Sequence, residues 1–359
     1  MNPFRLLQSV YPHASVVLAV LLLIMANMIF SQPRIQNDFW PLIQSRLNPD
    51  NKDWFMRHVA DIRRESCTLV HPVSLPAIAF VGSSQVRQGI DWNLMETLLP
   101  DYHIRNCAVP GMDMLRACFA EQLLLQPSDR VVVLWISELD VRPDASLGIS
   151  WMRPFATWSG LRHSIHSLNT KQRARQWRNM VDLALASTFE LWRSRDYLRH
   201  ILFHSLSSGS TRSAVEQSFE GDWRKDVRTF DIEDMDALTA QMTALFLFVS
   251  TAKANGASIV VFEGRVNPSI CTETSEKRRS WVRERLLAAA LEYGFDYIPT
   301  AQQQVQIEPA DWSDMTHFNV AGREKMTRYL AQFFNAWRGR TDGPVNTADQ
   351  SVDFMKYMK

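Results

Sequence analysis

The chain has 359 residues, of which 46% are hydrophobic and 21% are charged, and its formal net charge is +1. This composition excludes an intrinsically disordered protein, and the length allows one large α/β core or two smaller ones. The near-neutral charge gives no reason to expect a nucleic-acid partner, which normally requires a strong basic excess.

An apolar run without any charged residue covers residues 14–30. It is about as long as a membrane-spanning helix, which needs roughly 17 to 25 residues. Ile24 and Ile29 stand where a signal peptidase requires small residues, so the pattern favours an uncleaved anchor over a cleaved signal peptide or a buried core helix. Basic residues flank both ends of the run and leave its orientation open. We therefore expect a single-pass membrane anchor over residues 1–31.

Polar residues and four prolines fill residues 32–75, which we interpret as a stalk with short helices. A catalytic domain is expected over residues 76–338. Short apolar runs typical of buried parallel strands lie at 77–81, 130–136 and 257–262, and a shorter one at 295–298. Stretches with helical periodicity alternate with these runs, and the last of them covers about 320–337. The alternation predicts a parallel sheet covered by helices on both faces.

Residues 145–230 interrupt this alternation and are predicted to form a helical insertion rich in tryptophan and arginine. Nine basic residues face three acidic ones between residues 151 and 200. Such an excess would attract anionic lipid headgroups, an acidic glycan or an acidic partner, although a solvated helix face explains it equally well. The polar segment 339–359 is expected to be a mobile tail.

The four cysteines, Cys67, Cys107, Cys118 and Cys271, are too far apart in the sequence for a metal knuckle or a redox pair. No metal site and no organic cofactor are therefore expected. At least two of these residues are predicted to be buried free thiols, and an exported protein could also form disulfides whose pairing the sequence leaves open.

Three short motifs fall where parallel strands end, which is the edge at which sites form in open α/β sheets. After the first strand, Gly82 allows a sharp turn that presents Ser83 and Ser84, either as a nucleophile or as a helix cap. Gly111 ends the segment 106–111 and could offer its N–H group to an oxyanion. Asp314 precedes His317 by three residues, a spacing that lets a carboxylate orient an imidazole acting as a general base.

Together these motifs resemble the blocks of the SGNH-hydrolase superfamily. Gly82, Ser83 and Ser84 are similar to its first block, residues 106–111 to its second, and residues 314–322 to its last. The resemblance implies a three-layer α/β/α flavodoxin-like fold. It also implies serine catalysis on esters with Ser84, His317 and Asp314, the oxyanion being held by the N–H groups of Ser84 and Gly111.

The chain departs from this family pattern at the end of the second long apolar run. In the family, the corresponding strand end usually carries an asparagine that donates to the oxyanion. Residues 135–140 contain no asparagine. Losing one such donor costs about a hundredfold or more in rate. Arg87, Arg265 and Asn267 lie near strand ends and are candidate substrate-binding residues, with a surface salt bridge as the alternative explanation for the arginines.

The anchor, the serine motif and the insertion are most similar to envelope-polysaccharide acylation proteins, such as the alginate O-acetylation factors and the D-alanyl transfer protein. The resemblance implies an enzyme in the inner membrane, with its domain on the periplasmic or extracellular side, that transfers or removes acyl groups on a polysaccharide. A multispanning membrane acyltransferase would be its partner. The alternative is an inactive scaffold that binds a glycan or such a partner through the insertion.

Overall fold

A computed structural model describes residues 12–47, 54–67, 75–138, 140–141, 147, 150–204, 235–270 and 273–341. Its centre is a five-stranded parallel sheet with the strand order β2-β1-β3-β4-β5. The strands are β1 (Ala77–Val81), β2 (His103–Asn106), β3 (Asp129–Ile136), β4 (Ser258–Glu263) and β5 (Asp296–Ile298). The prediction of an α/β fold with a parallel sheet is confirmed, and this strand order is that of flavodoxin-like doubly wound folds.

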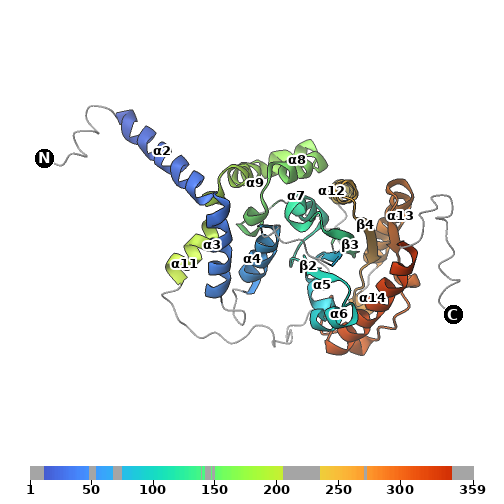
Figure 1. Cartoon of the computed structure of the whole chain (residues 1–359). Helices are drawn as coiled ribbons and strands as arrows, with labels where there is room; N and C mark the ends of the chain where they lie inside the picture. The colour runs from blue at the N-terminus through green and yellow to red at the C-terminus, as the bar shows by residue number, and fades with distance from the viewer. Residues whose placement is uncertain are drawn as a thin grey trace.

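Two helix layers cover the sheet, because successive side chains of a buried strand point to opposite faces. Val131, Val133 and Trp135 of β3 join one apolar cluster, whereas Val132, Leu134 and Ile136 join the other. Figure 1 shows α7 and α12 on one side of the sheet and α5, α6 and α14 on the other. The helices beside the sheet are α5 (Ser84–Gly89), α6 (Trp92–Leu98), α7 (Met114–Leu124), α12 (Met235–Ala254), α13 (Glu273–Tyr293) and α14 (Val320–Thr341). Short 3₁₀ turns cover Ser150–Phe155, Pro268–Ile270, Thr300–Gln302 and Pro309–Asp311.

The apolar run at the start of the chain forms α2 (Pro12–Phe30), and its side chains between Val16 and Ile29 are largely exposed. Among the described residues, α12 over Asp236–Ala254 is long and apolar enough to cross a membrane, but 56% of that window is buried in the domain. A second candidate exists only if Val16–Phe30 and Pro33–Ile43 count as one span across their 78° bend. Most described side chains of α2 are therefore exposed, whereas α12 is packed largely inside the domain.

The described residues of the segment predicted as a stalk do form short helices, but these helices pack in the folded domain. They are α3 (Pro33–Arg46) and α4 (Trp54–Cys67), and Trp40, Ile43 and Val59 in these helices are completely buried in the same cluster as α7 and α12. The polar residues that suggested a stalk have partners from other parts of the chain. Arg63 forms a buried salt bridge of 2.9 Å with Glu190, which also pairs with Arg193.

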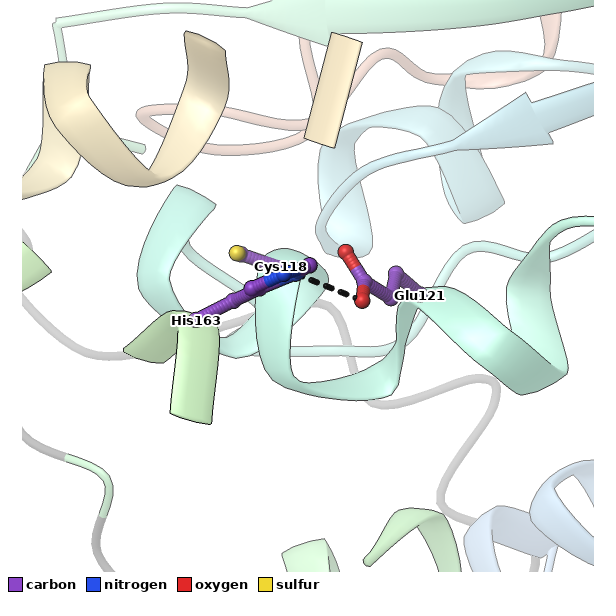
Figure 2. Close-up of side chains that lie close together, drawn as sticks. All are labelled: Cys118, Glu121 and His163. Carbon is purple, nitrogen blue, oxygen red and sulfur yellow. Dashed lines mark ion pairs between the residues drawn. The ribbon is translucent and has the colours of Figure 1, made fainter. Parts of the chain in front are cut away.

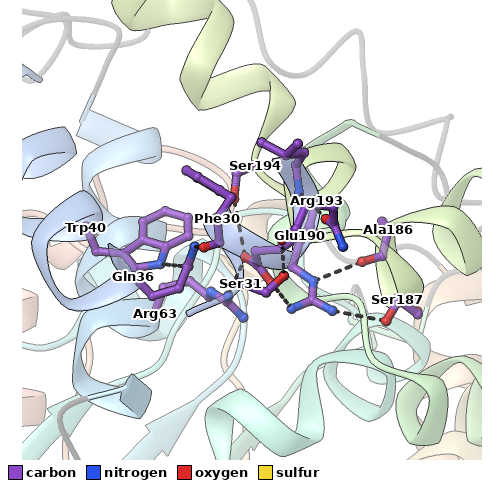
Figure 3. A network of polar contacts seen from close by, with 12 residues as sticks. Phe30, Ser31, Gln36, Trp40, Arg63, Ala186, Ser187, Glu190, Arg193 and Ser194 are labelled. Carbon is purple, nitrogen blue, oxygen red and sulfur yellow. Dashed lines mark hydrogen bonds and ion pairs between the residues drawn. The ribbon is translucent and has the colours of Figure 1, made fainter. Parts of the chain in front are cut away.

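Figure 3 shows this polar network, which joins the N-terminal helices to the insertion. The amide of Gln36 donates to the carbonyl of Phe30 at 2.7 Å, and its oxygen accepts from the indole of Trp40 at 2.9 Å. The guanidinium of Arg63 lies 5.2 Å from the centre of the Trp40 ring. A buried ion pair is tolerated when further hydrogen bonds satisfy its atoms, as they do for Glu190.

The insertion between β3 and β4 is helical over its described residues. It contains α8 (Trp158–Ser167), α9 (Thr170–Thr188), α10 (Glu190–Arg193) and α11 (Arg195–His204). Its predicted continuation over residues 205–230 lies outside the described residues, as do residues 342–359 of the predicted tail, whereas 339–341 end α14.

Candidate active site

Ser84 is the first residue of α5, directly after β1. A side chain at Gly82 would overlap the Cγ2 atom of Val86, so only glycine lets α5 fold back this closely over the strand. The hydroxyl of Ser83 caps α5 by accepting from the N–H group of Gln85 at 3.4 Å. The two serines therefore have different roles. The hydroxyl of Ser83 is used to cap the helix, whereas the hydroxyl of Ser84 faces the loop before α14.

The loop before α14 presents His317 toward β1. A β-bridge between Trp312 and Phe318 closes this loop, and the N–H group of Ser313 donates to the carbonyl of His317 at 2.9 Å. The Oδ1 atom of Asp314 accepts from the N–H groups of Thr316 and His317 at 2.8 and 2.9 Å. Its Oδ2 atom lies 2.7 Å from the Nδ1 atom of His317. The same turn thus fixes both the carboxylate and the imidazole.

Ser84, His317 and Asp314 form one continuous chain of hydrogen bonds, since the Nε2 atom of His317 lies 2.8 Å from the hydroxyl oxygen of Ser84. The side chains of His317 and Asp314 are 18% and 21% exposed, so the site is open to a ligand. Burial works to raise the pKa of Asp314, but the hydrogen bond and charge of His317 and two backbone N–H groups outweigh it and lower the pKa below its ordinary value. A serine, an imidazole and an ionised carboxylate in this order can carry out nucleophilic acyl chemistry.

Gly111 lies in the loop that follows β2. Its φ angle is +71°, a left-handed conformation that glycine adopts without strain, and its carbonyl accepts from the guanidinium of Arg116 at 2.6 Å. The same loop is tied to the β1 turn, because the N–H group of Val109 donates to the carbonyl of Gly82 at 2.9 Å. The segment carrying Gly111 is therefore fixed beside the turn carrying Ser84.

The end of β3 lacks the asparagine, and the polar groups there bind one another. The carboxylate of Asp140 accepts from both the N–H group and the hydroxyl of Ser137, at 2.8 and 2.7 Å. Glu138 forms an ion pair of 2.5 Å with Arg279 of α13. These contacts stabilise the strand end and occupy the polar side chains there.

Two of the three predicted substrate-binding residues are held by the protein itself. The guanidinium of Arg265 donates to Gln303 at 2.9 Å, and Asn267 supports the catalytic loop through its contacts with Met315 and Asp314. Burial lowers the pKa of Arg265. Arg87 is half-buried on α5, three residues after Ser84, and burial lowers its pKa to about 10.

His58 of α4 also lies at this edge of the site, and the sequence analysis did not identify it. Its Nε2 atom lies 2.7 Å from the carbonyl of Ala108, and because a carbonyl only accepts, this nitrogen must donate. Burial and the charge of Arg87 outweigh this hydrogen bond and lower the pKa of His58 to about 4. The helical periodicity of residues 54–67 could have indicated a packed helix that carries His58. Interpreting these residues as a stalk left His58 out of the candidate residues.

The described cysteines Cys107 and Cys118 are buried free thiols, as predicted for at least two of the four. Burial raises the pKa of both, to about 12 for Cys107. Neither contributes a nucleophile at neutral pH, because the thiolate is the reactive form.

Two solved structures that resemble this chain do so at low sequence identity. No protein-family model matches the chain, and no curated protein matches it. A structure described as a candidate platelet activating factor from Streptococcus pneumonia is 14% identical over 79% of this chain and 95% of its own, with a TM-score of 0.38. A GDSL-like lipase from Bacteroides thetaiotaomicron is 13% identical over 78% of this chain and 98% of its own, with a TM-score of 0.37.

Proposed function

We propose that the chain is a serine-dependent acyl-ester enzyme of the SGNH-hydrolase type. The observation that carries this proposal is the unbroken chain from Ser84 through His317 to Asp314, with contacts of 2.8 and 2.7 Å. The order of these residues along the chain matches the motifs on which the family resemblance rests.

In the proposed reaction the hydroxyl oxygen of Ser84 attacks the carbonyl carbon of an ester, and its proton moves to the Nε2 atom of His317. Asp314 accepts from Nδ1 and stabilises the imidazolium that forms. The N–H groups of Ser84 and Gly111 hold the negative oxygen of the tetrahedral intermediate. The intermediate collapses when His317 returns the proton to the leaving alcohol, which leaves an acyl group on Ser84.

A second hydroxyl compound then removes the acyl group by the reverse sequence. Water as the acceptor makes the enzyme an esterase, and a sugar hydroxyl makes it a transferase. Both outcomes use the same three residues. We favour an O-acyl group, in particular acetyl, on a cell-envelope or exported polysaccharide, on the strength of the family resemblance.

We further propose that α2 anchors the chain in the inner membrane, with the domain outside the cytoplasm and beside a multispanning acyltransferase. The exposed apolar surface of α2 supports this. So does an exposed stripe on α9, where Trp177, Val181 and Leu185 recur at four-residue spacing beside exposed basic residues. Figure 1 shows α9 near the end of α2 that joins α3, and the N–H group of Leu191 donates to Asn27 of α2 at 3.1 Å. Alkaline extraction of membranes tests the anchor, since release of the chain into the soluble fraction would contradict it.

The chemistry is tested by incubating the full-length chain in detergent with p-nitrophenyl acetate, with and without a glycan acceptor, followed by intact mass spectrometry. We expect an acetyl adduct and ester turnover that both disappear in Ser84→Ala, with a loss of roughly 10⁴-fold or more. Ser83→Ala is the matched control and should lose only the stability of a helix cap, about 1 kcal/mol.

A folded wild type with neither adduct nor turnover would instead support the inactive scaffold, with the insertion as its binding surface. Equal loss of turnover in Ser83→Ala and Ser84→Ala would mean that the site collapses and would contradict the assignment of Ser84.

A further inference from the structure

A second imidazole lies beside a carboxylate in the helix layer that contains α7. Cys118 and Glu121 stand one turn apart on α7, and His163 reaches them from α8 (Figure 2). The Sγ atom, a carboxylate oxygen and a ring nitrogen of these residues all lie within 4.8 Å of one another. The proposed reaction uses none of the three.

The two helices that carry these residues approach each other unusually closely. A side chain at Gly160 would overlap the carbonyl oxygen of Phe119, so glycine is required for the backbones to touch. The hydroxyl of Ser164 donates to the carbonyl of Leu115 at 3.3 Å on the same interface. His163 lies between these two contacts in the sequence, and its position over α7 is therefore fixed by the packing.

The carboxylate of Glu121 is 0% exposed, and a buried anion requires donors or a cation. The hydroxyls of Ser159 and Thr251 each donate to it at 3.2 Å. The Nδ1 atom of His163 is 2.8 Å from Oε1, but this buried nitrogen forms no hydrogen bond with any described residue. The two groups are therefore in ion-pair contact, but their geometry is not that of a hydrogen bond.

A shared cation explains this geometry better than a direct pair does. A thiol, an imidazole nitrogen and a carboxylate oxygen are the ligand types that Zn²⁺ binds, whereas Mg²⁺ and Ca²⁺ select oxygen. Zinc bonds of about 2.0 to 2.3 Å place tetrahedral ligands roughly 3 to 4 Å apart, so small side-chain rotations would complete the site.

We propose that Cys118, Glu121 and His163 bind one Zn²⁺ ion. Binding replaces the S–H bond of Cys118 with an S–Zn bond and releases the proton to solvent, while His163 and Glu121 bind as neutral imidazole and carboxylate. A water molecule fills the fourth position. The hydroxyl of Thr251 on α12 donates to the carboxylate from outside, and the ion links α8 of the insertion to α7.

The site escapes sequence analysis because its ligands lack a recognisable spacing. Cys118 has no second cysteine nearby, and Glu121 and His163 lie on different helices. The prediction that no metal binds rested on cysteine spacing alone, and helix packing supplies the missing ligand.

The test uses the full-length chain purified without chelators. We expect about one equivalent of zinc by mass spectrometry of the metal content, and after its removal a titration with Co²⁺ should produce the charge-transfer absorption of a cobalt–thiolate bond. Cys118→Ala should abolish that absorption, and His163→Gln should weaken Co²⁺ binding by more than about tenfold.

Two matched variants control for general damage. Cys107→Ala removes another buried thiol, and His166→Gln changes an exposed histidine on the same helix, so both should bind Co²⁺ like the wild type. Absence of zinc and of the thiolate absorption in the wild type would overturn the proposal, and this result does not depend on any variant folding. Unchanged absorption in Cys118→Ala would overturn it as well. Neither result bears on the ester chemistry of Ser84.

Discussion

Two imidazole–carboxylate pairs with nearly equal separations have different surroundings. Nδ1 of His317 is 2.7 Å from Asp314, and Nδ1 of His163 is 2.8 Å from Glu121. The first pair is hydrogen-bonded within one turn at the open edge of the sheet, and its second nitrogen contacts Ser84. The second pair lies between two helices, and Cys118 lies beside it. The Nδ1 atom of His163 forms no hydrogen bond with any residue that the structure describes. The distance between imidazole and carboxylate therefore does not indicate what each pair does. The third group beside the pair, Ser84 in one case and Cys118 in the other, is more informative.

The comparison is tested most strongly at Asp314. Asp314→Asn keeps the shape of the turn but removes the acceptor that fixes the His317 tautomer, so we expect kcat/KM for p-nitrophenyl acetate to fall about 10⁴-fold. The melting temperature should change little, which separates loss of chemistry from loss of fold. A decrease of less than about tenfold would mean that His317 does not depend on its carboxylate.

The second pair depends on close helix packing, and Gly160→Ala should disturb it. A methyl group there collides with the Phe119 carbonyl, so we expect a loss of about 2 to 3 kcal/mol in the free energy of unfolding, measured with urea. The control is Gly256→Ala, where the space is open and only the positive φ angle costs about 1 kcal/mol. Equal losses in the two variants would show that α7 and α8 can move apart without penalty.

A third imidazole, that of His58, extends the comparison because it contacts a neutral carbonyl and not a carboxylate. Its pKa is lowered to about 4 in the folded chain, against about 6.5 when unfolded, so between these pH values only the unfolded state binds the proton. Stability should therefore fall as the pH drops from about 6.5 to about 4, by up to about 2 kcal/mol because His58 is only partly buried.

His58→Gln isolates this contribution, since an amide can still donate to Ala108 but does not titrate. Urea unfolding at several pH values should show a shallower acid loss in this variant than in the wild type. Identical pH profiles would indicate that His58 titrates normally in the folded chain.

Four of the five strands and the turn that holds Asp314 and His317 were predictable because their signals are local. The strand β2 has no apolar run, and the contact of His317 with Ser84 joins positions 233 residues apart. Buried parallel strands appear as continuous apolar runs, and Asp314 and His317 share one turn. The stalk was wrong because Arg63, which looks solvent-facing in the sequence, pairs with Glu190 far along the chain. Arg265 likewise has a partner outside its own segment, because Gln303 lies 38 residues further along the chain. Contacts between distant segments decide the role of a polar residue, and a single sequence does not reveal them.

The network of Gln36, Arg63 and Glu190 connects α3 and α4 to the insertion, and the contact between Asn27 and Leu191 connects α2 to it. The domain is therefore joined to α2 by direct contacts and not by a flexible linker. A tethered domain sweeps a wide volume and searches for its substrate. A domain fixed to its anchor holds its reactive serine at one height and one orientation above the bilayer in which we propose α2 to lie. In the arrangement that we propose, substrates would have to reach that height, which suits transfer from a neighbouring membrane protein better than capture of freely diffusing chains.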